Sequence, residues 1–473
     1  MQTPQLIIVG GYFLLIFAVG LYATRYVRDS TDFLLAGRRL GVPLAAAALA
    51  ATHFGGGFVV GTGGWGFRYG LSGMAYAFGV GLSLLLLAVV SARRMRRLGL
   101  VTVPDYLELR YGSRAVRLLG AVLSLAAIIG ILGAQVWASQ GALSILGIDP
   151  TLAAVAATIL FIVYTAASGL WGVTLTDALQ LLIIFIGIPI AAVLGLRSAG
   201  GFAGIREGIA GMELEVTTSA FFEPLGAGGV LIVAAILPTL MYTLIGQDFY
   251  QRLFAARDAG VAVRAALLAG AVLIIYAAFP ALAGMAARGI FGDGIEPSQA
   301  IPMLVVEVLP VWSGAIVVGA ILGAIMSTAD SLLIAGTSHL TNDIYVKVLN
   351  PAAAEDTRRL LLISRLGTVA IGVLALLLAL SVREIIGLLL LSYTMYAAGV
   401  FVPVVLGLYW QRGTAAGAIA GILGGAVAGV AAAQGWITLP VVPEIVAGAV
   451  VSLVLYVAVS LVTTQRAGAR PGA

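Results

Sequence analysis

The sequence lacks several kinds of residue on which soluble enzymes depend. Among its 473 residues it has no cysteine, two histidines and a single lysine, Lys347. The absence of cysteine excludes thiol catalysis, disulfides and thiolate-held zinc or iron–sulfur centres. Because the lysine follows Val346 and not a glycine, the sequence has no phosphate-binding P-loop, which argues against ATP-driven transport by this chain. His53 and His339 stand far apart and outside any HExxH motif, so a multi-histidine metal centre is not expected.

Charge is also scarce. Charged residues make up 10% of the chain and hydrophobic residues 61%, with a mean hydropathy of +1.08. Soluble proteins have about 25% charged and about 45–50% apolar residues. A surface that faces water needs more charge than this, so the composition excludes a cytosolic enzyme, a disordered chain and a secreted disulfide scaffold. The arginines lie in short loops and form no basic stripe, so nucleic acid is not an expected partner.

Long apolar runs are what the sequence has in abundance. A helix needs about 20 apolar residues to cross a hydrocarbon core of about 30 Å. Thirteen runs approach that length: 5–23, 42–62, 71–92, 116–146, 151–169, 174–199, 228–246, 265–288, 311–338, 359–380, 384–409, 415–433 and 443–463. They predict an all-α polytopic membrane protein of about 13 transmembrane helices. We expect a single domain over 1–473, multi-pass in the plasma (inner) membrane.

The positions of the arginines predict the orientation. With the N-terminus outside, 21 of the 26 lysine and arginine residues fall on the cytoplasmic loops and adjoining helix ends. The other five are Arg68, Arg197, Arg206, Arg288 and Arg383. Basic residues collect on the cytoplasmic side of membrane proteins, so the chain is predicted to be N-outside and C-inside.

Two of the predicted spans carry breaks in corresponding places. The run 42–62 contains Gly55, Gly56 and Gly57, and the run 228–246 contains Pro238 and ends at Gly246. Such interruptions are typical of transporters built from inverted repeats with discontinuous helices. Five spans over 42–199 and five over 228–409 would form the two repeats, with flanking helices at 5–23, 415–433 and 443–463. Alternatively, the glycines only allow close helix packing.

Polar residues inside the membrane are functional candidates by default, because they are costly there. Three groups qualify: Thr52-His53, residues 174–180 with Asp177, and Ser327 to Ser331 with Asp330. Hydroxyls on neighbouring helix positions, together with carbonyls of an unwound segment, could supply the oxygens that a sodium ion needs. The alternatives are that the hydroxyls bond back to their own helix, that Asp177 caps a helix start, and that His53 bonds a backbone carbonyl.

Several short motifs, in this order and spacing, carry a resemblance to a known family. They are residues 33–38 (FLLAGR), 51–57 (ATHFGGG), 176–180 (TDALQ), 251–252 (QR), 326–331 (MSTADS) and 343–345 (DIY). From about Asp32 to Trp410 the chain resembles the sodium:solute symporter family. The resemblance implies a leucine-transporter-like fold with a five-plus-five core, and sodium as the cofactor ion.

The resemblance also implies sodium ligands. They would be the carbonyls of Ala51, Phe54 and Ala324 and the hydroxyls of Ser327 and Thr328. A possible second sodium, nearer the cytoplasm, would be bound by Asp177 and Ser331 with Ser327, and Asp330 lies close by.

The substrate is less defined by these motifs. The patterns in runs 42–62 and 311–338 are most similar to the choline-transporter branch, but His53 and Gly246 stand where that branch has cage tryptophans. The candidate substrate-binding residues are Thr52, His53, Gly55, Gly56, Phe58, Gln135, Tyr242, Gln247 and Tyr393. Free N–H groups at a broken helix end favour an anionic group, so a small carboxylate or amino acid is favoured.

The leading hypothesis is a sodium-coupled secondary symporter that imports such a solute by alternating access. One alternative is a proton-coupled symporter of the same fold, with His53, Asp177 or Asp330 as the proton carrier. Another is a membrane sensor or scaffold that has lost transport. An enzyme is not expected, because no nucleophile–base pair is visible. The expected partners are a small-molecule substrate and the lipid bilayer, with no nucleic acid and no obligate protein partner.

Overall fold

The computed structural model describes residues 3–144, 147–381, 385–437 and 443–464, and over these ranges it contains helices and turns with no strand longer than an isolated bridge. The helices of the first half are α1 (Thr3–Ala23), α2 (Ser30–Leu35), α3 (Val42–His53), α4 (Thr62–Tyr69), α5 (Ala75–Leu87), α6 (Arg93–Arg97), α7 (Val103–Tyr111), α8 (Arg114–Ser144), α9 (Pro150–Ser198) and α10 (Gly201–Gly208). Those of the second half are α11 (Gly229–Thr243), α12 (Gln247–Ala255), α13 (Ala259–Tyr276), α14 (Ala278–Phe291), α15 (Ala300–Met303), α16 (Val311–Ser338), α17 (Thr357–Ser381), α18 (Ile385–Val405), α19 (Ala415–Ala433) and α20 (Glu444–Thr464).

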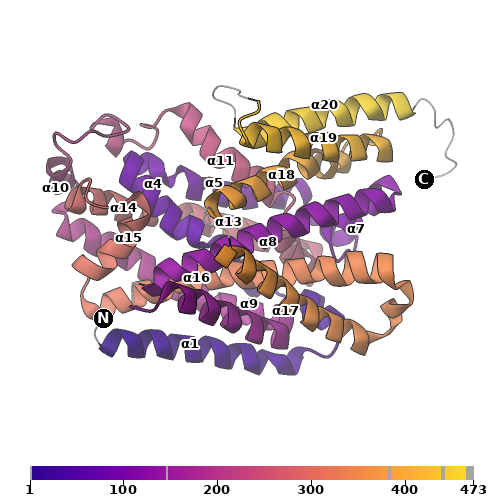
Figure 1. Ribbon diagram of the computed structural model, residues 1–473, viewed down its shortest axis with the longest axis horizontal. Helices are drawn as coiled ribbons and strands as arrows, with labels where there is room; N and C mark the ends of the chain where they lie inside the picture. The colour runs from indigo at the N-terminus through magenta and orange to yellow at the C-terminus, as the bar shows by residue number, and fades with distance from the viewer. Residues whose placement is uncertain (1–2, 145–146, 382–384, 438–442, 465–473) are drawn as a thin grey trace.

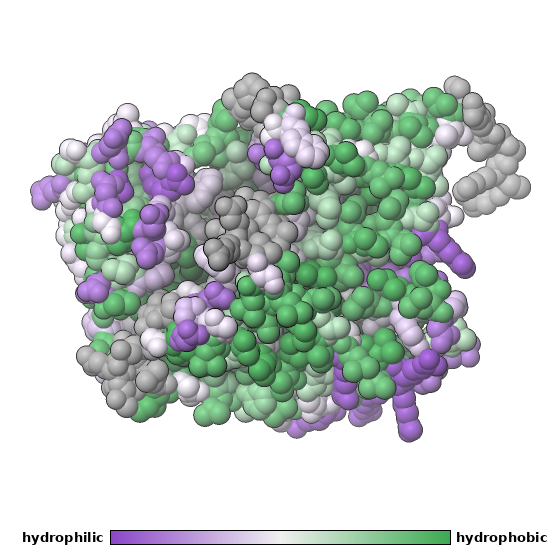
Figure 2. Space-filling model, viewed as in Figure 1, coloured by the Kyte–Doolittle hydropathy of each residue, from purple (hydrophilic) through white to green (hydrophobic). Residues whose placement is uncertain are grey.

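The long helices run roughly along the longest axis of the molecule (Figure 1). In that view α1 lies along one edge, and α19 and α20 lie along the opposite edge. Apolar side chains cover the middle of the visible face, and most hydrophilic ones gather toward the two ends of the long axis (Figure 2). An apolar middle between polar ends is what a bilayer requires, so the all-α membrane class is confirmed.

The number of spans differs from the prediction. Ten continuous helical segments of the described residues are long and apolar enough to cross a membrane, and one of them, Gly57–Arg97, runs through α4, α5 and α6. The number is eleven if the bent pair α11 and α12 forms one span, against thirteen expected. The difference has a physical origin, because the apolar runs do not correspond one to one with continuous helices. The run 42–62 is split between α3, which has only 12 residues, and the segment that leads into α4. The runs 151–169 and 174–199 both lie within α9, which has 49 residues.

α16 forms the centre of the core. Every residue that the structure describes from Gly314 to Ser338 is buried except Ile316. The helix packs against α8 and α9 on the first half of the chain and against α3 at the broken span. Its buried face therefore brings the Ser327–Ser331 group to the middle of the protein, where side chains of α3 and α9 surround it.

The break inside α9 depends on one glycine. Gly169 has φ 55° and ψ −150°, a backbone conformation that is essentially restricted to glycine. A β-carbon there would lie 2.5 Å from the Phe33 carbonyl oxygen. We expect Gly169→Ala to destabilise the protein by about 3 kcal/mol or more, because backbone strain adds to the clash. Thermal unfolding in detergent measures this change.

Gly112→Ala is the matched control for that experiment. Gly112 ends α7 at φ 62° and ψ 30°, and a β-carbon there would meet nothing within 4 Å. Its replacement should cost about 1 kcal/mol, from the positive φ alone. Equal losses of stability in the two variants would contradict the proposed clash at Phe33.

Candidate functional site

Two helices are interrupted in the middle of the protein. α3 ends at His53, where Phe54 takes a non-helical conformation (φ −72°, ψ 37°), and the chain becomes helical again in a π-turn at Gly57–Gly61 that leads into α4. α11 and α12 meet at an angle of 49°, with Gly246 extended (φ −62°, ψ 122°) between them. The breaks that the glycines predicted are therefore present in both halves. α12 packs against both α3 and α16, so the two breaks share one region of the core.

Oxygen atoms from α3 and α16 meet at the first break. The Ser327 hydroxyl donates to the Ala51 carbonyl (2.9 Å) and to the Ala324 carbonyl (3.0 Å). The Thr328 hydroxyl lies 3.0 Å from the Thr52 carbonyl and 3.3 Å from the Ala324 carbonyl. These hydroxyls bond to their own helix, as the alternative interpretation expected, and also reach across to the end of α3. Four of the five predicted sodium ligands thus lie together.

The fifth predicted ligand, Phe54, ends the same helix. Its side chain is fully buried, and its N–H donates to the carbonyls of Ala50 (3.0 Å) and Ala51 (3.2 Å). The next residue, Gly55, lets the Thr328 hydroxyl approach, because a β-carbon on Gly55 would lie 2.7 Å from that oxygen. The donor set consists of neutral hydroxyl and carbonyl oxygens, which is the chemistry that a hard cation such as sodium prefers.

A second polar group lies beside the first. Both carboxylate oxygens of Asp177 are buried without a hydrogen-bond partner in the described part of the chain, and the Arg252 Nη2 atom is 3.9 Å from one of them. Arg252 also donates to the Ser331 hydroxyl, which contacts the Thr52 hydroxyl at 2.9 Å. Asp177 lies well inside α9, beyond the break at Gly169, so it does not cap a helix start.

Asp330 points to a different neighbour. The Thr165 hydroxyl donates to one of its carboxylate oxygens at 3.4 Å, and the other oxygen is buried with no hydrogen-bond partner among the described residues. Asp330 and Asp177 therefore have different contact partners among the described residues, Thr165 and Arg252. Sequence reasoning identified both carboxylates but missed Arg252 as the nearest cation. In the sequence, Arg252 stands out only as part of the QR motif, and the spacing between Arg252 and Ser331 does not indicate that their side chains meet.

The predicted substrate-binding residues fall into two sets. His53 stacks on Phe249 with ring centroids 4.0 Å apart, and its Nε2 atom lies 3.1 Å from the Thr243 hydroxyl. The histidine thus contacts a side-chain hydroxyl, where the alternative interpretation expected a backbone carbonyl. Tyr242 and Tyr393 are in contact at 4.3 Å between centroids.

The remaining substrate candidates lie around the break after α3. The Gln135 side-chain oxygen lies 3.4 Å from the Gly56 backbone nitrogen, which donates to it. Phe58 packs against Phe54 with ring centroids 4.4 Å apart. Gln135 is therefore placed to satisfy one of the N–H groups that the helix break leaves free.

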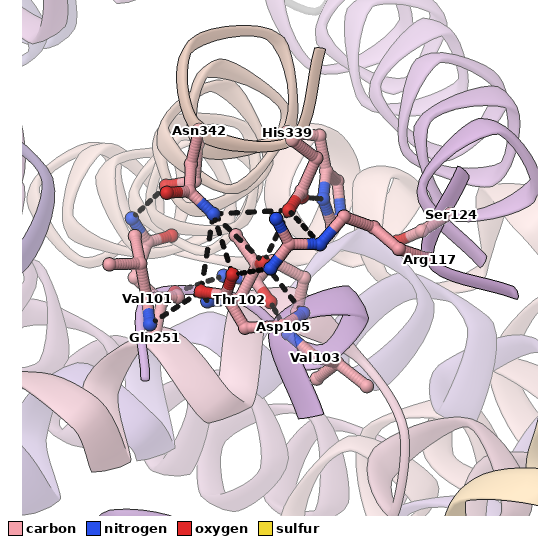
Figure 3. Close-up of polar contacts among 12 residues, drawn as sticks. Val101, Thr102, Val103, Asp105, Arg117, Ser124, Gln251, His339 and Asn342 are labelled. Carbon is pink, nitrogen blue, oxygen red and sulfur yellow. Dashed lines mark hydrogen bonds and ion pairs between the residues drawn. The ribbon is translucent and has the colours of Figure 1, made fainter. Parts of the chain in front are cut away.

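The Gln247 side chain is directed toward the start of α7. Its side-chain oxygen accepts from the Val103 N–H at 2.9 Å, and its side-chain nitrogen donates to the Val101 carbonyl at 3.1 Å. The amide thus holds the start of α7. It adjoins a buried network drawn in Figure 3, in which Thr102 donates to Asp343 (2.8 Å) and Asp343 contacts His339 (2.8 Å).

Arg117 completes this network with ion pairs to Asp105 and to Glu108, the latter at 2.8 Å. The network ties α7 and α8 to the π-helical continuation of α16 at His339–Leu349. It lies toward the end of the molecule where α7 is found, away from α4 and α10 (Figure 1). Near that other end, a cavity of about 540 Å³ is lined by residues that include Arg68, Glu215 and Arg288. None of the predicted sodium or substrate residues lines it.

Comparison with known proteins identifies the family. The model of the sodium:solute symporter family matches residues 33–425. The chain belongs to the sodium:solute symporter family. Like its relatives, the symporter is a sodium-coupled membrane transporter of a small solute and not an enzyme.

Several curated relatives match over most of their length. A high-affinity choline transporter of Caenorhabditis elegans is 27% identical, over 91% of the symporter and 78% of the relative. The sodium/pantothenate symporter of Escherichia coli is 28% identical, over 90% of both chains. The osmoregulated proline transporter OpuE of Bacillus subtilis is 27% identical, over 99% and 97% of the two chains. Their substrates differ, so identity at this level does not select one.

Solved structures show the same fold. The structure of a Na⁺-coupled sialic acid symporter in a substrate-bound outward-open state matches with a TM-score of 0.85 at 19% identity, over 98% of each chain. MhsT in complex with L-phenylalanine matches with a TM-score of 0.56 at 13% identity, over 89% of the symporter and 98% of that chain. The leucine-transporter-like fold that the motifs implied is confirmed.

Proposed function

We propose that this symporter imports a small organic solute, either a carboxylate or an amino acid, driven by sodium bound between α3 and α16. The observation that carries the proposal is the meeting of the Ser327 and Thr328 hydroxyls with the carbonyls at the broken end of α3. The site would lie in the plasma (inner) membrane. The partners that we propose for the symporter are a small-molecule substrate and the surrounding lipid.

We further propose that the chain crosses the membrane thirteen times, N-outside and C-inside. A helix of 49 residues is about 74 Å long, more than twice the hydrocarbon core, so α9 would supply two spans that meet at Gly169. α3 and α4 would together form one broken span, as α11 and α12 would. The inverted repeats would then cover 42–199 and 228–409, with α1, α19 and α20 outside them.

Sodium bound at this site would link α3 of the first proposed repeat to α16 of the second. The ion would draw oxygens from the broken α3 and from α16, so it would favour the state in which those two helices are in contact. Substrate binding at the adjoining break would then be stronger in the sodium-loaded state. Coupling of this kind requires different affinities in the two states, and the ion supplies that difference.

The carboxylate oxygens of Asp177, which have no hydrogen bond from the described residues, support a second sodium close to Ser331 and Ser327. Two buried carboxylate oxygens without hydrogen bonds are costly in the membrane unless a cation lies between them and its other ligands. Asp330 would remain outside the ligand set, since its described partner is Thr165.

Gly55→Ala tests the first site. A β-carbon at Gly55 would push the Thr328 hydroxyl out of place, because the two atoms would be 2.7 Å apart. We expect the sodium concentration that gives half-maximal thermal stabilisation to rise at least about tenfold, the loss typical when a group that orients a metal ligand is disturbed. Sodium chloride is titrated against potassium chloride at constant ionic strength.

Gly61→Ala is the matched control, since a β-carbon at Gly61 would meet nothing within 4 Å on the same broken span. Its sodium titration should be that of the wild type. If Gly55→Ala shows the same titration as Gly61→Ala, sodium does not bind at Thr328.

A further inference from the structure

The centre of the symporter contains more negative than positive charge. Asp177, Asp248 and Asp330 have exposures of 0%, 3% and 0%, and the arginine among them, Arg252, is also 0% exposed. The three buried carboxylates outnumber the one guanidinium, which pairs with Asp177. A sodium ion at the proposed second site would lie at Asp177, the carboxylate with which Arg252 pairs. Asp248 and Asp330 are then left without an ion pair among the described residues, and buried charges in membranes are normally paired.

Of these two carboxylates, Asp248 is the one that lies at a helix break. None of the ion pairs between described residues includes it. Arg252, one turn further along α12, donates to the backbone carbonyl of Asp248 at 3.0 Å and turns its guanidinium toward Ser331 and Asp177. The described side-chain hydrogen bond to the Asp248 carboxylate comes from the Tyr242 hydroxyl, at 3.3 Å.

The carboxylate lies at the break between α11 and α12. Asp248 stands in the first turn of α12, and a β-carbon on Gly246 would be 2.6 Å from its Oδ1 atom and 3.1 Å from the Tyr242 ring. Gly246 thus makes room for both side chains at the break. Broken helices are where transporters of this architecture bind their substrates.

Aromatic rings surround this position. Tyr242 has Tyr393, Tyr396 and Phe249 around it at centroid distances of 4.3, 6.2 and 6.0 Å. Phe249 in turn carries the stacked ring of His53. The faces of aromatic rings attract cations, so a carboxylate beside tyrosines matches a positively charged nitrogen better than an anion or a neutral polyol.

From this arrangement we propose that Asp248 binds a positively charged nitrogen of the transported solute, which makes the substrate an amine or an amino acid. The inference rests on the proposed function and narrows its substrate class. In an amino acid, the ammonium would pair with Asp248, and the carboxylate would be left for the other break, where the Gly56 N–H donates to Gln135. A substrate with a carboxylate and no cationic nitrogen would add a negative charge beside Asp248.

The test measures thermal stabilisation in saturating sodium by a panel of small solutes. The panel contains matched sets on one carbon frame, such as pyrrolidine, L-proline and cyclopentanecarboxylate, together with choline, other amino acids, pantothenate and myo-inositol. We expect every solute that stabilises the symporter in sodium to carry a cationic nitrogen. In Asp248→Asn, the apparent affinity of the symporter for such a solute should fall about thirtyfold or more, because an isosteric amide keeps the hydrogen bond from Tyr242 and loses the charge.

Glu207→Gln is the matched control, because Glu207 is exposed on α10 and its neutralisation changes the net charge equally. Three results would overturn the inference: stabilisation only by solutes without a cationic nitrogen, no stabilisation by any amine in the panel, or equal affinity in Asp248→Asn and Glu207→Gln. Sodium titrations of the same variants separate this from the proposed function. Stabilisation by sodium itself should persist in Asp248→Asn, and its absence from the wild type would count against the sodium site instead.

Discussion

Simultaneous replacement of Ser327 and Thr328 by alanine should greatly weaken the stabilisation of the symporter by sodium. The two hydroxyls supply the side-chain oxygens of the proposed site, and the carbonyls of Ala51, Thr52 and Ala324 that they contact would remain. The loss of two ligands should cost more than the tenfold to hundredfold that disturbance of a supporting group typically costs. We expect the apparent sodium affinity to fall by a factor of about 100 or more, measured as the sodium dependence of the thermal midpoint.

The matched control is Thr337→Ala with Ser338→Ala, further along α16. These hydroxyls also bond back to their own helix, at Leu333 and Ile334, but they contact Thr368 and Gln251 in place of α3. The control should keep the sodium titration of the wild type, although its overall stability falls. An unchanged titration in the Ser327/Thr328 variant would remove sodium from this site.

Replacement of Arg252 should be the most destabilising single change in the core. Arg252 is fully buried, and it is the cation nearest to Asp177, at 3.9 Å. Its removal leaves a buried carboxylate without compensation, which typically costs about 3–5 kcal/mol. We expect Arg252→Met to lower the free energy of unfolding by this amount in potassium, and by less in saturating sodium, because sodium near Asp177 would restore a cation.

A second substitution separates charge from packing. Asp177→Asn in the Arg252→Met background removes the uncompensated carboxylate, so the double variant should be more stable than Arg252→Met alone. Arg264→Met on the exposed face of α13 is the control, with an expected change within about 0.5 kcal/mol. If Asp177→Asn adds its own loss to that of Arg252→Met, the two residues do not interact and the charge argument is wrong.

The sequence allowed much of the fold to be predicted, because long apolar runs and glycine breaks are local signals. The breaks at Phe54 and Gly246 lie where the glycines indicated. The count of continuous helices could not be predicted in the same way. Whether two apolar runs join depends on the backbone of a single residue, such as Gly169, and composition says little about that.

The candidate site was predicted where neighbouring hydroxyls and a family motif coincide. Ser327 and Thr328 lie where the motif implied, because their positions on α16 fix their direction once α3 packs against it. Gln247 and Asp248 show what the sequence could not reveal. These neighbours point in different directions from α12, so the amide bonds Val101 and Val103 while the carboxylate lies against Tyr242. Only the rotation of the helix, set by tertiary packing, decides which of them faces the break.

Equilibrium binding of radioactive sodium to the purified wild-type protein tests the central claim most directly. Binding is measured against excess unlabelled sodium and against excess potassium, at matched ionic strength. The account predicts saturable binding that unlabelled sodium displaces and potassium does not, and whose affinity falls by a factor of about 100 or more in the Ser327/Thr328 double variant. Binding that does not saturate, or that potassium displaces equally, would contradict a sodium site between α3 and α16.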